Sequence, residues 1–201
     1  MIFYASFSKI IPMPSHNKVL KVDESISLHL PEIIMAQELF DLIDRQRDYL
    51  SKWLIWVDNT RSVKDSINFL KEASIFNRGG QQLTTIIKYN DKIIGSIGFV
   101  KIENLNKNGE LGYWISENMQ GKGIVTKASE RLINYAFKNL DLNRIVIKTD
   151  SQNIKSKAIP ARMGFVYEGT LRQDRFTNDQ FQNTEVYSLL KKDWIENKKT
   201  S

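Results

Sequence analysis

Two strand-like segments joined by a two-residue turn constrain the fold of this chain most strongly. Residues 83–89 and 92–102 are rich in β-branched side chains, and only Asn90 and Asp91 separate them. A connection of two residues joins antiparallel strands, and Asn and Asp are favoured in such turns. The sequence therefore predicts an antiparallel hairpin, beside which the other strands must form a sheet.

Strand-like and helix-like stretches alternate along the rest of the chain. Residues 25–30 alternate with a period of two and stop at Pro31, a residue favoured in the first turn of a helix. Further strands are predicted at 110–115, 144–150, 165–176 and 182–194, and helices at 31–46, 62–76, 121–138 and 153–163. This order predicts an α/β (α+β) fold with a central, mostly antiparallel mixed sheet flanked by helices.

The helix predicted at 121–138 has one apolar face. Its apolar side chains recur at the spacing of a helix face, at positions 124, 128, 132, 133, 136 and 137. We expect this face to pack on the sheet.

Chain length and composition suit one globular domain. The 201 residues are 41% hydrophobic, so one core is sufficient. We expect residues 1–20 to be an N-terminal extension and residues 21–201 to form the domain. Lys9 and Pro12 interrupt the early apolar stretch, and no apolar run approaches the roughly 18 to 20 residues of a membrane span. We therefore expect a cytoplasmic protein that has no membrane partner.

The content of cysteine and histidine excludes several kinds of site. The chain has no cysteine, so it has no disulfide, no thiolate metal site and no cysteine nucleophile. His16 and His29 lack ligand-like spacing, and we expect no metal site. The net charge of +6 favours an acidic partner such as a phosphate-bearing cofactor or nucleic acid, or it is only a solvated basic surface.

A glycine-bearing turn follows the apolar run LGYWI. Residues 119–128 read MQGKGIVTKA and begin the predicted helix, where backbone N–H groups have no helical partner. Gly121 and Gly123 would let a phosphate approach these groups, and Lys122 and Lys127 add positive charge. The spacing matches neither the Walker A loop nor the dinucleotide-binding motif. The turn is therefore either a site for another phosphate-bearing ligand or a tight strand-to-helix connection.

A second motif follows the strand at 144–150. The segment reads NIKSKAIPARMGFVYEG, with Asn153 and Ser156 at the start of a short helix and Gly164 just past its end. Together, QGKGIVTKA, N-x-x-S and GF-x-x-EG resemble the GNAT family of N-acetyltransferases. Within this family they are similar to the RimJ/RimL type, which acetylates the N-termini of ribosomal proteins.

The resemblance extends over roughly residues 22–194, nearly the whole predicted domain. It includes LSKWLIW at 50–56 and GYWI at 112–115. The family motif Q/R-x-x-G-x-G/A falls on Gln120, Gly123 and Val125. Valine replaces a small residue there, so its side chain must point away from the phosphates.

The resemblance implies a single GNAT-type domain that binds acetyl-CoA between two splayed parallel strands, at 110–115 and 144–150. The pantetheine amides would pair with the backbone as an added strand does, and the pyrophosphate would lie on the N–H groups of 120–125. Asn153 would hydrogen-bond the pantetheine arm, cap its helix, or do both. The implied cofactor-binding residues are Trp114, Ile115, Ser116, Gln120, Gly121, Lys122, Gly123, Ile124, Val125, Asn153 and Ser156.

The implied reaction transfers an acetyl group from a thioester to a primary amine, which attacks only when neutral. Glu110 matches the position of the general base in many members, and Ser156 matches the serine that protonates the departing thiolate in RimL-type enzymes. Each also has an ordinary interpretation, as a solvated strand-end charge and as a helix cap. Many members carry a tyrosine where this chain has Pro160. A backbone N–H near residues 113–115 would meet the oxyanion.

The acceptor amine is expected between the first two helices and the last strands. Aromatic side chains at spacings of three and four are equally typical of a core, and two adjacent charged residues in a late strand can pair with each other. The implied acceptor-binding residues are Tyr49, Trp53, Trp56, Tyr113, Asp174 and Arg175.

Three functions remain open at this point. The first is acetylation of a protein N-terminus and the second is acetylation of a small amine, such as a polyamine, amino sugar or antibiotic. A cleft lined by carboxylates such as Asp41, Asp44 and Asp48 would favour a polyamine. The third is a non-catalytic acyl-CoA-binding protein.

The C-terminal segment is basic, which is compatible with ribosome association through RNA. It is equally typical of a solubilising end, and its lysines are Lys191, Lys192, Lys198 and Lys199. The family often forms homodimers, so a homodimer is also an expectation for this chain.

Overall fold

A computed structural model describes residues 19–177 and 179–198. Most of the predicted N-terminal extension and Lys199 lie outside the described residues.

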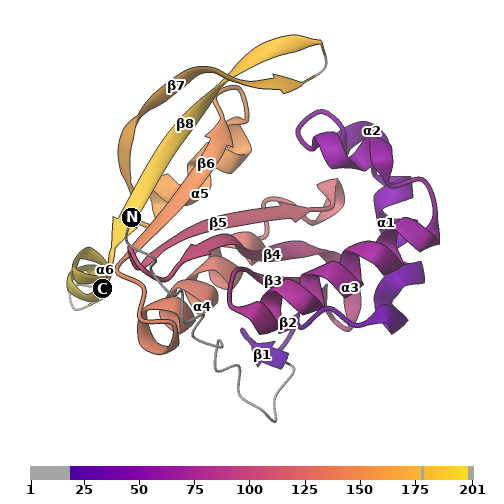
Figure 1. The fold of residues 1–201 in the computed structure, drawn as a ribbon, viewed down its shortest axis with the longest axis horizontal. Helices are drawn as coiled ribbons and strands as arrows, with labels where there is room; N and C mark the ends of the chain where they lie inside the picture. The colour runs from indigo at the N-terminus through magenta and orange to yellow at the C-terminus, as the bar shows by residue number, and fades with distance from the viewer. Residues whose placement is uncertain (1–18, 178, 199–201) are drawn as a thin grey trace, which may run out of the picture.

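The described strands form one eight-stranded sheet, with the spatial order β1-β2-β3-β4-β5-β6-β8-β7 (Figure 1). The strands are β1 (Val19–Lys21), β2 (Ile26–His29), β3 (Leu83–Tyr89), β4 (Lys92–Glu103), β5 (Asn108–Ile115), β6 (Arg144–Asp150), β7 (Val166–Thr177) and β8 (Gln180–Leu190). Neighbouring strands run antiparallel except for β5 and β6, which are parallel. The predicted mixed, mostly antiparallel sheet is confirmed.

The predicted hairpin forms the centre of the sheet. β3 and β4 pair from Leu83↔Phe99 to Tyr89↔Lys92. Asn90 and Asp91 have positive φ angles of 46° and 62°, the backbone that a two-residue hairpin turn needs.

Helices cover both faces of the sheet. They are η1 (Ile33–Met35), α1 (Ala36–Arg45), α2 (Arg47–Leu50), η2 (Ile55–Asn59), α3 (Val63–Gly79), η3 (Glu117–Met119), α4 (Ile124–Asn139), α5 (Ile154–Arg162) and α6 (Lys191–Asn197). Ser62 and Asp65 form a capping box at the start of α3, and Gly80 ends it in the left-handed conformation. Local sequence signals therefore set both ends of α3.

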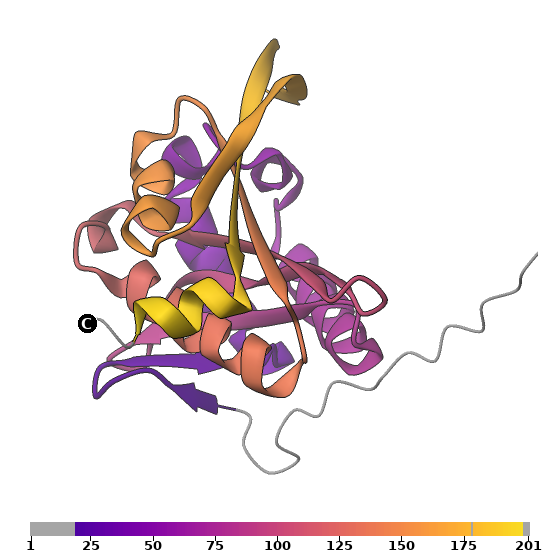
Figure 2. The same cartoon turned by 90° about the vertical axis from the view of Figure 1, so that its left-hand side faces the viewer.

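Two hydrophobic clusters lie on opposite faces of the sheet. Ile86 packs with α1, α2 and α3, whereas its neighbour Ile87 packs in the cluster that contains α4. Adjacent strand residues point to opposite faces, so both side chains are fully buried. The apolar face predicted for α4 is buried as expected, and Figure 2 shows α4 and α6 on the same side of the sheet.

Several element boundaries differ from the prediction. The strand predicted at 182–194 ends at Leu190 and α6 follows it, because a helical turn lets Trp194 pack in the core and donate to Asn134 Oδ1 at 2.9 Å. The helix predicted from 31 begins with η1 at Ile33. The helix predicted from 121 begins at Ile124, because two preceding glycines adopt positive φ angles.

An ion pair ties the three strands at the β7 end of the sheet together. Arg144 in β6 donates two hydrogen bonds to Glu168 in β7, of 2.6 and 2.5 Å. Ser188 in β8 donates to the same carboxylate at 2.8 Å. The Arg144 guanidinium, and then the Ser188 hydroxyl, lower the pKa of Glu168 to about 2.

This depressed pKa predicts how stability changes in acid. Because the folded pKa of Glu168 lies below its usual value of 4.5, the ionised carboxylate stabilises the fold above that pH, and this contribution is lost as pH falls towards about 2. Both side chains are partly exposed, so we expect Glu168→Gln to cost about 1 kcal/mol at neutral pH. Urea unfolding at a series of pH values should show the difference from wild type closing in acid. A difference that persists near pH 2 would indicate a packing defect instead.

Candidate active site

The parallel strands β5 and β6 separate after a short paired region. They pair only at Asn108↔Arg144, Gly109↔Ile145 and Glu110↔Val146, and then diverge, as Figure 1 shows. From residue 111 onward β5 still pairs with β4, but no strand of the described residues pairs with its other edge. We call this opening the splay. A free strand edge is a site where an extended ligand can add main-chain hydrogen bonds.

The register of β4 and β5 determines which backbone groups face the splay. The Ser116 N–H donates to the Ile94 carbonyl at 2.8 Å, on the β4 side. In an antiparallel ladder the backbone groups of alternate residues point to the same neighbour. The N–H and C=O groups of Trp114 therefore face β4, and those of Tyr113 and Ile115 face the splay.

The glycine-bearing turn has the backbone of an anion cradle. Gly121 and Gly123 have φ angles of 73° and 72°, and a Cβ added at either position would meet nothing within 4 Å. The first turn of α4 has no acidic residue and no side-chain cap. Apart from bonds within helices and strands, the N–H groups of residues 121–126 donate to no backbone carbonyl of the described residues. This geometry fits the pyrophosphate of acetyl-CoA.

Val125 fits this geometry as well, because its side chain lies in the core cluster with α4 and is directed away from the cradle.

The cations near the cradle differ partly from those expected. Lys122 lies at the turn, with Nζ 3.5 Å from the Met119 sulfur. Lys127 instead pairs with Asp23 at 2.8 Å, so its charge is already compensated. Two cations from α5 were missed in the sequence. Lys155 Nζ donates to Gln120 Oε1 at 2.6 Å, and Arg162 Nη2 lies 3.5 Å from Thr126 Oγ1.

A sequence signal for these two cations exists. Lys155 and Arg162 are seven residues apart, which places them on the same side of a helix two turns apart. α5 therefore presents both charges towards the start of α4.

Asn153 and Ser156 form the start of α5. Asn153 Oδ1 accepts from the Ser156 N–H at 3.0 Å, so Asn153 is an N-cap. Capping uses the side-chain oxygen and leaves the amide Nδ2 as the group that can donate to a ligand. The Ser156 hydroxyl lies 3.5 Å from the Tyr113 hydroxyl, which reaches it from β5.

Glu110 lies where the splay begins. It is the last residue of β5 that pairs with β6, and its carboxylate lies 3.0 Å from Lys148 Nζ in β6. Its side chain is 29% exposed, so solvent water reaches it. Residues 110 and 114 lie on the same face of β5, and Trp114 packs against the α1–α3 cluster on that face. The Glu110 carboxylate therefore lies on the same face of β5 as Trp114, at the point where the splay begins.

An aromatic wall lies on this face and consists of Tyr49, Trp56 and Trp114. The rings of Trp56 and Trp114 lie 5.7 Å apart and are tilted by 58°. The Tyr49 hydroxyl contacts the Gln120 side-chain amide, which connects this wall to the cradle, and burial raises the pKa of Tyr49. Arg175 Nη2 donates to the Trp53 carbonyl at 3.2 Å. The predicted acceptor residues from α2, η2 and β7 are thus brought together.

Two predicted acceptor residues, Tyr113 and Asp174, lie away from the aromatic wall. Tyr113 packs on the opposite face of the sheet, in the cluster with α4. Asp174 is exposed in β7, and among the described residues no hydrogen bond or ion pair joins it to the wall. Its neighbour Arg175 interacts with Trp53.

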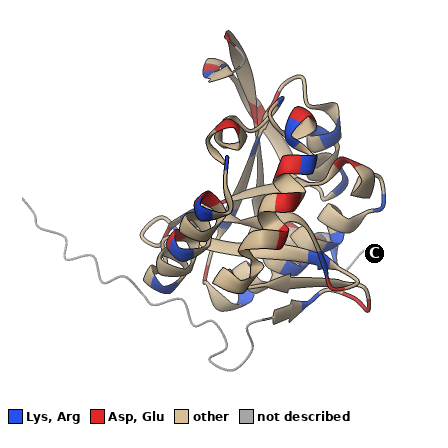
Figure 3. Cartoon of the chain, turned by 90° about the vertical axis from the view of Figure 1, so that its right-hand side faces the viewer, with Lys and Arg blue, Asp and Glu red and all other residues tan. Residues whose placement is uncertain are grey.

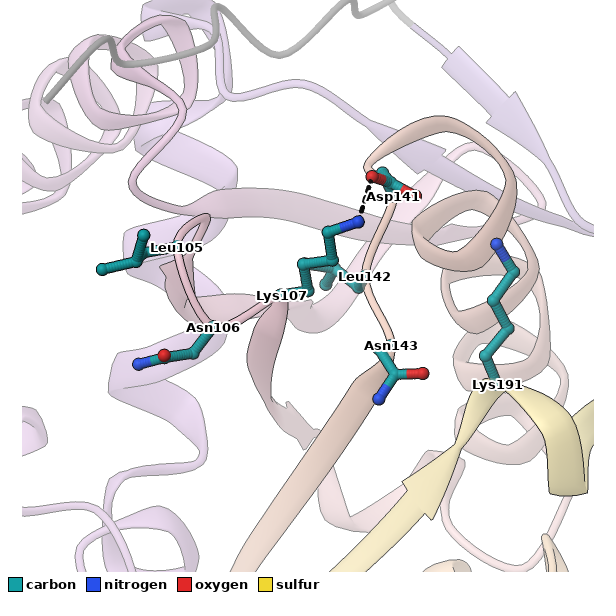
Figure 4. A pocket seen from close by; sticks show the side chains of 7 residues that line it. All are labelled: Leu105, Asn106, Lys107, Asp141, Leu142, Asn143 and Lys191. Carbon is teal, nitrogen blue, oxygen red and sulfur yellow. Dashed lines mark ion pairs between the residues drawn. The ribbon is translucent and has the colours of Figure 1, made fainter.

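A pocket of about 380 Å³ lies at the other end of the parallel strands (Figure 4). It is lined by the loops that precede β5 and β6 and by the start of α6, and Lys107 pairs there with Asp141 at 2.9 Å. Neither the cradle nor Glu110 contributes to it. We therefore assign the candidate site to the splay.

The described residues contain neither a candidate metal centre nor a candidate membrane-spanning helix. No group of three His, Asp or Glu side chains within residues 19–177 and 179–198 is arranged to hold a metal ion. In the same ranges, no helix has the length and apolar character needed to cross a bilayer.

Comparison with known proteins agrees with this geometry. Residues 31–166 match the acetyltransferase (GNAT) domain. The chain is 36% identical over 179 residues to the putative ribosomal N-acetyltransferase YdaF of Bacillus subtilis, covering 87% of this chain and 96% of that protein. It is 33% identical over 173 residues to the ribosomal-protein-serine acetyltransferase of Escherichia coli, covering 86% and 97%.

A solved structure supports the same assignment. The microcin C7 self-immunity acetyltransferase MccE, determined in complex with acetyl-CoA and AMP, is 34% identical and superimposes with a TM-score of 0.83. The match covers 86% of this chain and 96% of that chain. Because the family match spans more than half of the sequence and these relatives align over nearly their whole length, the chain belongs to the GNAT family of acetyltransferases.

Proposed function

We propose that this acetyltransferase moves an acetyl group from acetyl-CoA to the N-terminal α-amine of a protein, with ribosomal proteins as the first candidates. The observation that carries the proposal is the aromatic wall, linked to Arg175 through Trp53, on the same face of β5 as Glu110. An extended N-terminus offers a main chain and small side chains to such a surface. The names of the two relatives, which refer to ribosomal substrates, support this choice.

In this proposal the cradle and the free edge of β5 hold acetyl-CoA. The N–H groups of residues 121–126 would bind its pyrophosphate, with Lys122, Lys155 and Arg162 as nearby cations. The backbone groups of Tyr113 and Ile115 would pair with the pantetheine amides. Acetyl-CoA supplies an activated thioester, and the thiolate is its leaving group.

Glu110 is the proposed general base and Ser156 the proposed acid. The neutral amine attacks the thioester carbonyl carbon, the C–S bond breaks, and the amine loses one proton while the sulfur gains one. Glu110 takes the amine proton through a water, because its partly exposed position admits solvent. Ser156 donates to the sulfur from the start of α5. A backbone N–H facing the splay would stabilise the oxyanion.

The polar groups around the wall favour a peptide over a polyamine. Asp44 pairs with Arg47 at 2.9 Å, and Asp41 accepts from Gln37 at 2.8 Å on the exposed side of α1. Figure 3 shows acidic and basic positions intermixed on the helices of this side of the molecule. A polyamine needs a concentrated acidic surface, and the aromatic wall does not provide one.

A small-molecule acceptor is the second candidate. The self-immunity enzyme MccE is 34% identical, and its structure contains AMP. The paired rings of Trp56 and Trp114 could stack with a planar ring as readily as with a peptide.

One labelling experiment separates these candidates. Isotopically labelled acetyl-CoA would be incubated with the pure protein and two acceptor pools, unacetylated ribosomal proteins and a mixture of polyamines, amino sugars and nucleotides that carry amines. Mass spectrometry would locate the label. Label on protein α-amines would support the proposal, whereas label confined to small amines would refute it in favour of the second candidate. Binding of acetyl-CoA without any transfer would favour a non-catalytic protein.

Substitution of Arg175 tests whether the aromatic wall binds the acceptor. We expect Arg175→Ala to raise the KM for a peptide with a free N-terminal serine by about tenfold, because the link between β7 and Trp53 is lost. The KM for acetyl-CoA should stay the same, since Arg175 lies outside the cradle. Arg172→Ala, in the same exposed strand, is the matched control. An equal effect of both substitutions would show that the general charge of β7 matters and the Trp53 contact does not.

Ribosome association, a homodimer and a cytoplasmic location belong to the same proposal. Lys191, Lys192 and Lys198 lie on or next to α6, and such a basic end would bind RNA more weakly as salt increases. Co-sedimentation with ribosomes at increasing salt tests the association, and analytical ultracentrifugation tests the dimer.

A further inference from the structure

α5 contains a proline that deprives one helix carbonyl of its usual donor. In an α-helix the N–H of each residue donates to the carbonyl four residues earlier, and proline has no N–H. Pro160 lies inside α5 and is buried, so the Ser156 carbonyl cannot receive this bond. A sheltered carbonyl without a donor is costly unless another group reaches it.

Tyr113 supplies the missing donor from the neighbouring strand. Its hydroxyl donates to the Ser156 carbonyl at 3.2 Å, and the Ser156 hydroxyl lies 3.5 Å from the same tyrosine oxygen. The two residues are 43 positions apart in the chain. Burial raises the pKa of Tyr113 to about 12, so its hydroxyl keeps its proton and remains a hydrogen-bond donor.

Both backbone polar groups of Ser156 are therefore held by side chains. The Asn153 side chain accepts from its N–H at 3.0 Å, and the Tyr113 hydroxyl donates to its carbonyl. These two bonds leave the first turn of α5 little freedom to rotate. The direction of the Ser156 hydroxyl depends on this turn.

We propose that Tyr113 is a positioning residue for acetyl transfer: its hydroxyl replaces the helical hydrogen bond that Pro160 removes, and so holds Ser156 at the splay. The inference rests on the proposed role of Ser156 as the acid. Tyr113 itself transfers no proton. Pro160 lies one helical turn after Ser156 and has no hydroxyl. The hydroxyl that lies beside Ser156 therefore comes from Tyr113 in β5.

The first test is Tyr113→Phe, which removes the hydroxyl and keeps the ring. We expect kcat to fall by about tenfold or more, because a small displacement of a reacting group strongly reduces the rate. The KM for acetyl-CoA should change less than about twofold, since the cradle is intact. The acceptor would be a synthetic peptide with a free N-terminal serine, or spermidine if only small amines are labelled. Tyr89→Phe, in β3, is the matched control and should match wild type.

The second test is rescue by Pro160→Ala, which restores an N–H at the position that normally serves the Ser156 carbonyl. The double variant Tyr113→Phe with Pro160→Ala should regain most of the lost kcat. In a Ser156→Ala background, Tyr113→Phe should cause little further loss, because its effect is transmitted through Ser156. A wild-type kcat in Tyr113→Phe, or a double variant as slow as Tyr113→Phe alone, would overturn the proposal.

Urea unfolding of the same variants tests the inference without any acceptor. The midpoint should be lower in Tyr113→Phe than in wild type, and Pro160→Ala should reduce this difference. Independent effects of the two substitutions on the midpoint would mean that Tyr113 does not compensate for Pro160, which overturns the inference. Absence of transfer to N-terminal serine by wild-type protein would instead refute the proposed acceptor, and the unfolding result would be unaffected.

Discussion

Replacing Glu110 by glutamine is expected to lower kcat by about a hundredfold while leaving the affinity for acetyl-CoA unchanged. Glutamine has nearly the same size but cannot take a proton. Glu110 lies where β5 and β6 separate, next to Lys148 and away from the glycine turn. The substitution therefore removes proton transfer from the acceptor amine and leaves the cofactor contacts intact.

The effect of this substitution should depend on pH. A peptide α-amine has a pKa of about 8, so at lower pH most of the acceptor is protonated and must lose its proton before it attacks. Without Glu110 this step relies on solvent. The deficit should therefore be largest in weakly acidic buffer and should shrink as pH rises above about 8. Initial rates of thiol release at several pH values, with calorimetric titration of acetyl-CoA, measure both quantities.

Glu103→Gln is the matched control for Glu110→Gln. Glu103 also pairs with a lysine, Lys101, but on the exposed surface of β4. Its loss should leave the rate profile unchanged. If Glu110→Gln shows the same rates as this control, Glu110 has no part in the proton transfer.

Replacing Gly123 by alanine is expected to weaken acetyl-CoA binding by more than about tenfold. The added Cβ would meet no protein atom within 4 Å, so it would occupy the space through which a phosphate approaches the N–H groups. The φ angle of 72° is also unfavourable for alanine, which should cost about 1 kcal/mol of folding free energy. Isothermal titration and urea unfolding separate the two effects.

Gly169→Ala is the control for backbone strain. Gly169 has a positive φ of 149° and equally open space around its Cβ, but it lies in β7. Its substitution should reduce stability and leave acetyl-CoA affinity unchanged. Similar losses of affinity in both variants would show that general destabilisation, and not the cradle, explains the result.

Local patterns in the sequence determined much of this fold. The β3–β4 hairpin, the capping box and glycine end of α3, and the buried face of α4 each depend on residues within a few positions of one another. The motif resemblance also located the splay and the glycine turn. These features could be predicted because turn chemistry and periodicity act over short distances along the chain.

Some local predictions failed because tertiary packing outweighed them. The apolar and basic segment after Leu190 was compatible with a longer strand, yet it forms α6, which buries Trp194 against the core. Lys127 appeared suited to a phosphate, but Asp23 from the turn before β2 pairs with it. Neither outcome can be inferred from neighbouring residues alone.

The sequence by itself determined which elements form, where the glycine turn lies and which family the chain resembles. Only the tertiary structure decided which distant side chains meet: Tyr113 with Ser156, and Arg175 with Trp53, residues that are 43 and 122 positions apart. Such contacts depend on strand register and on the divergence of β5 and β6, which arise from packing across the whole sheet. Periodicity is a local property, so it identifies the face of an element but not the residue that will lie opposite it.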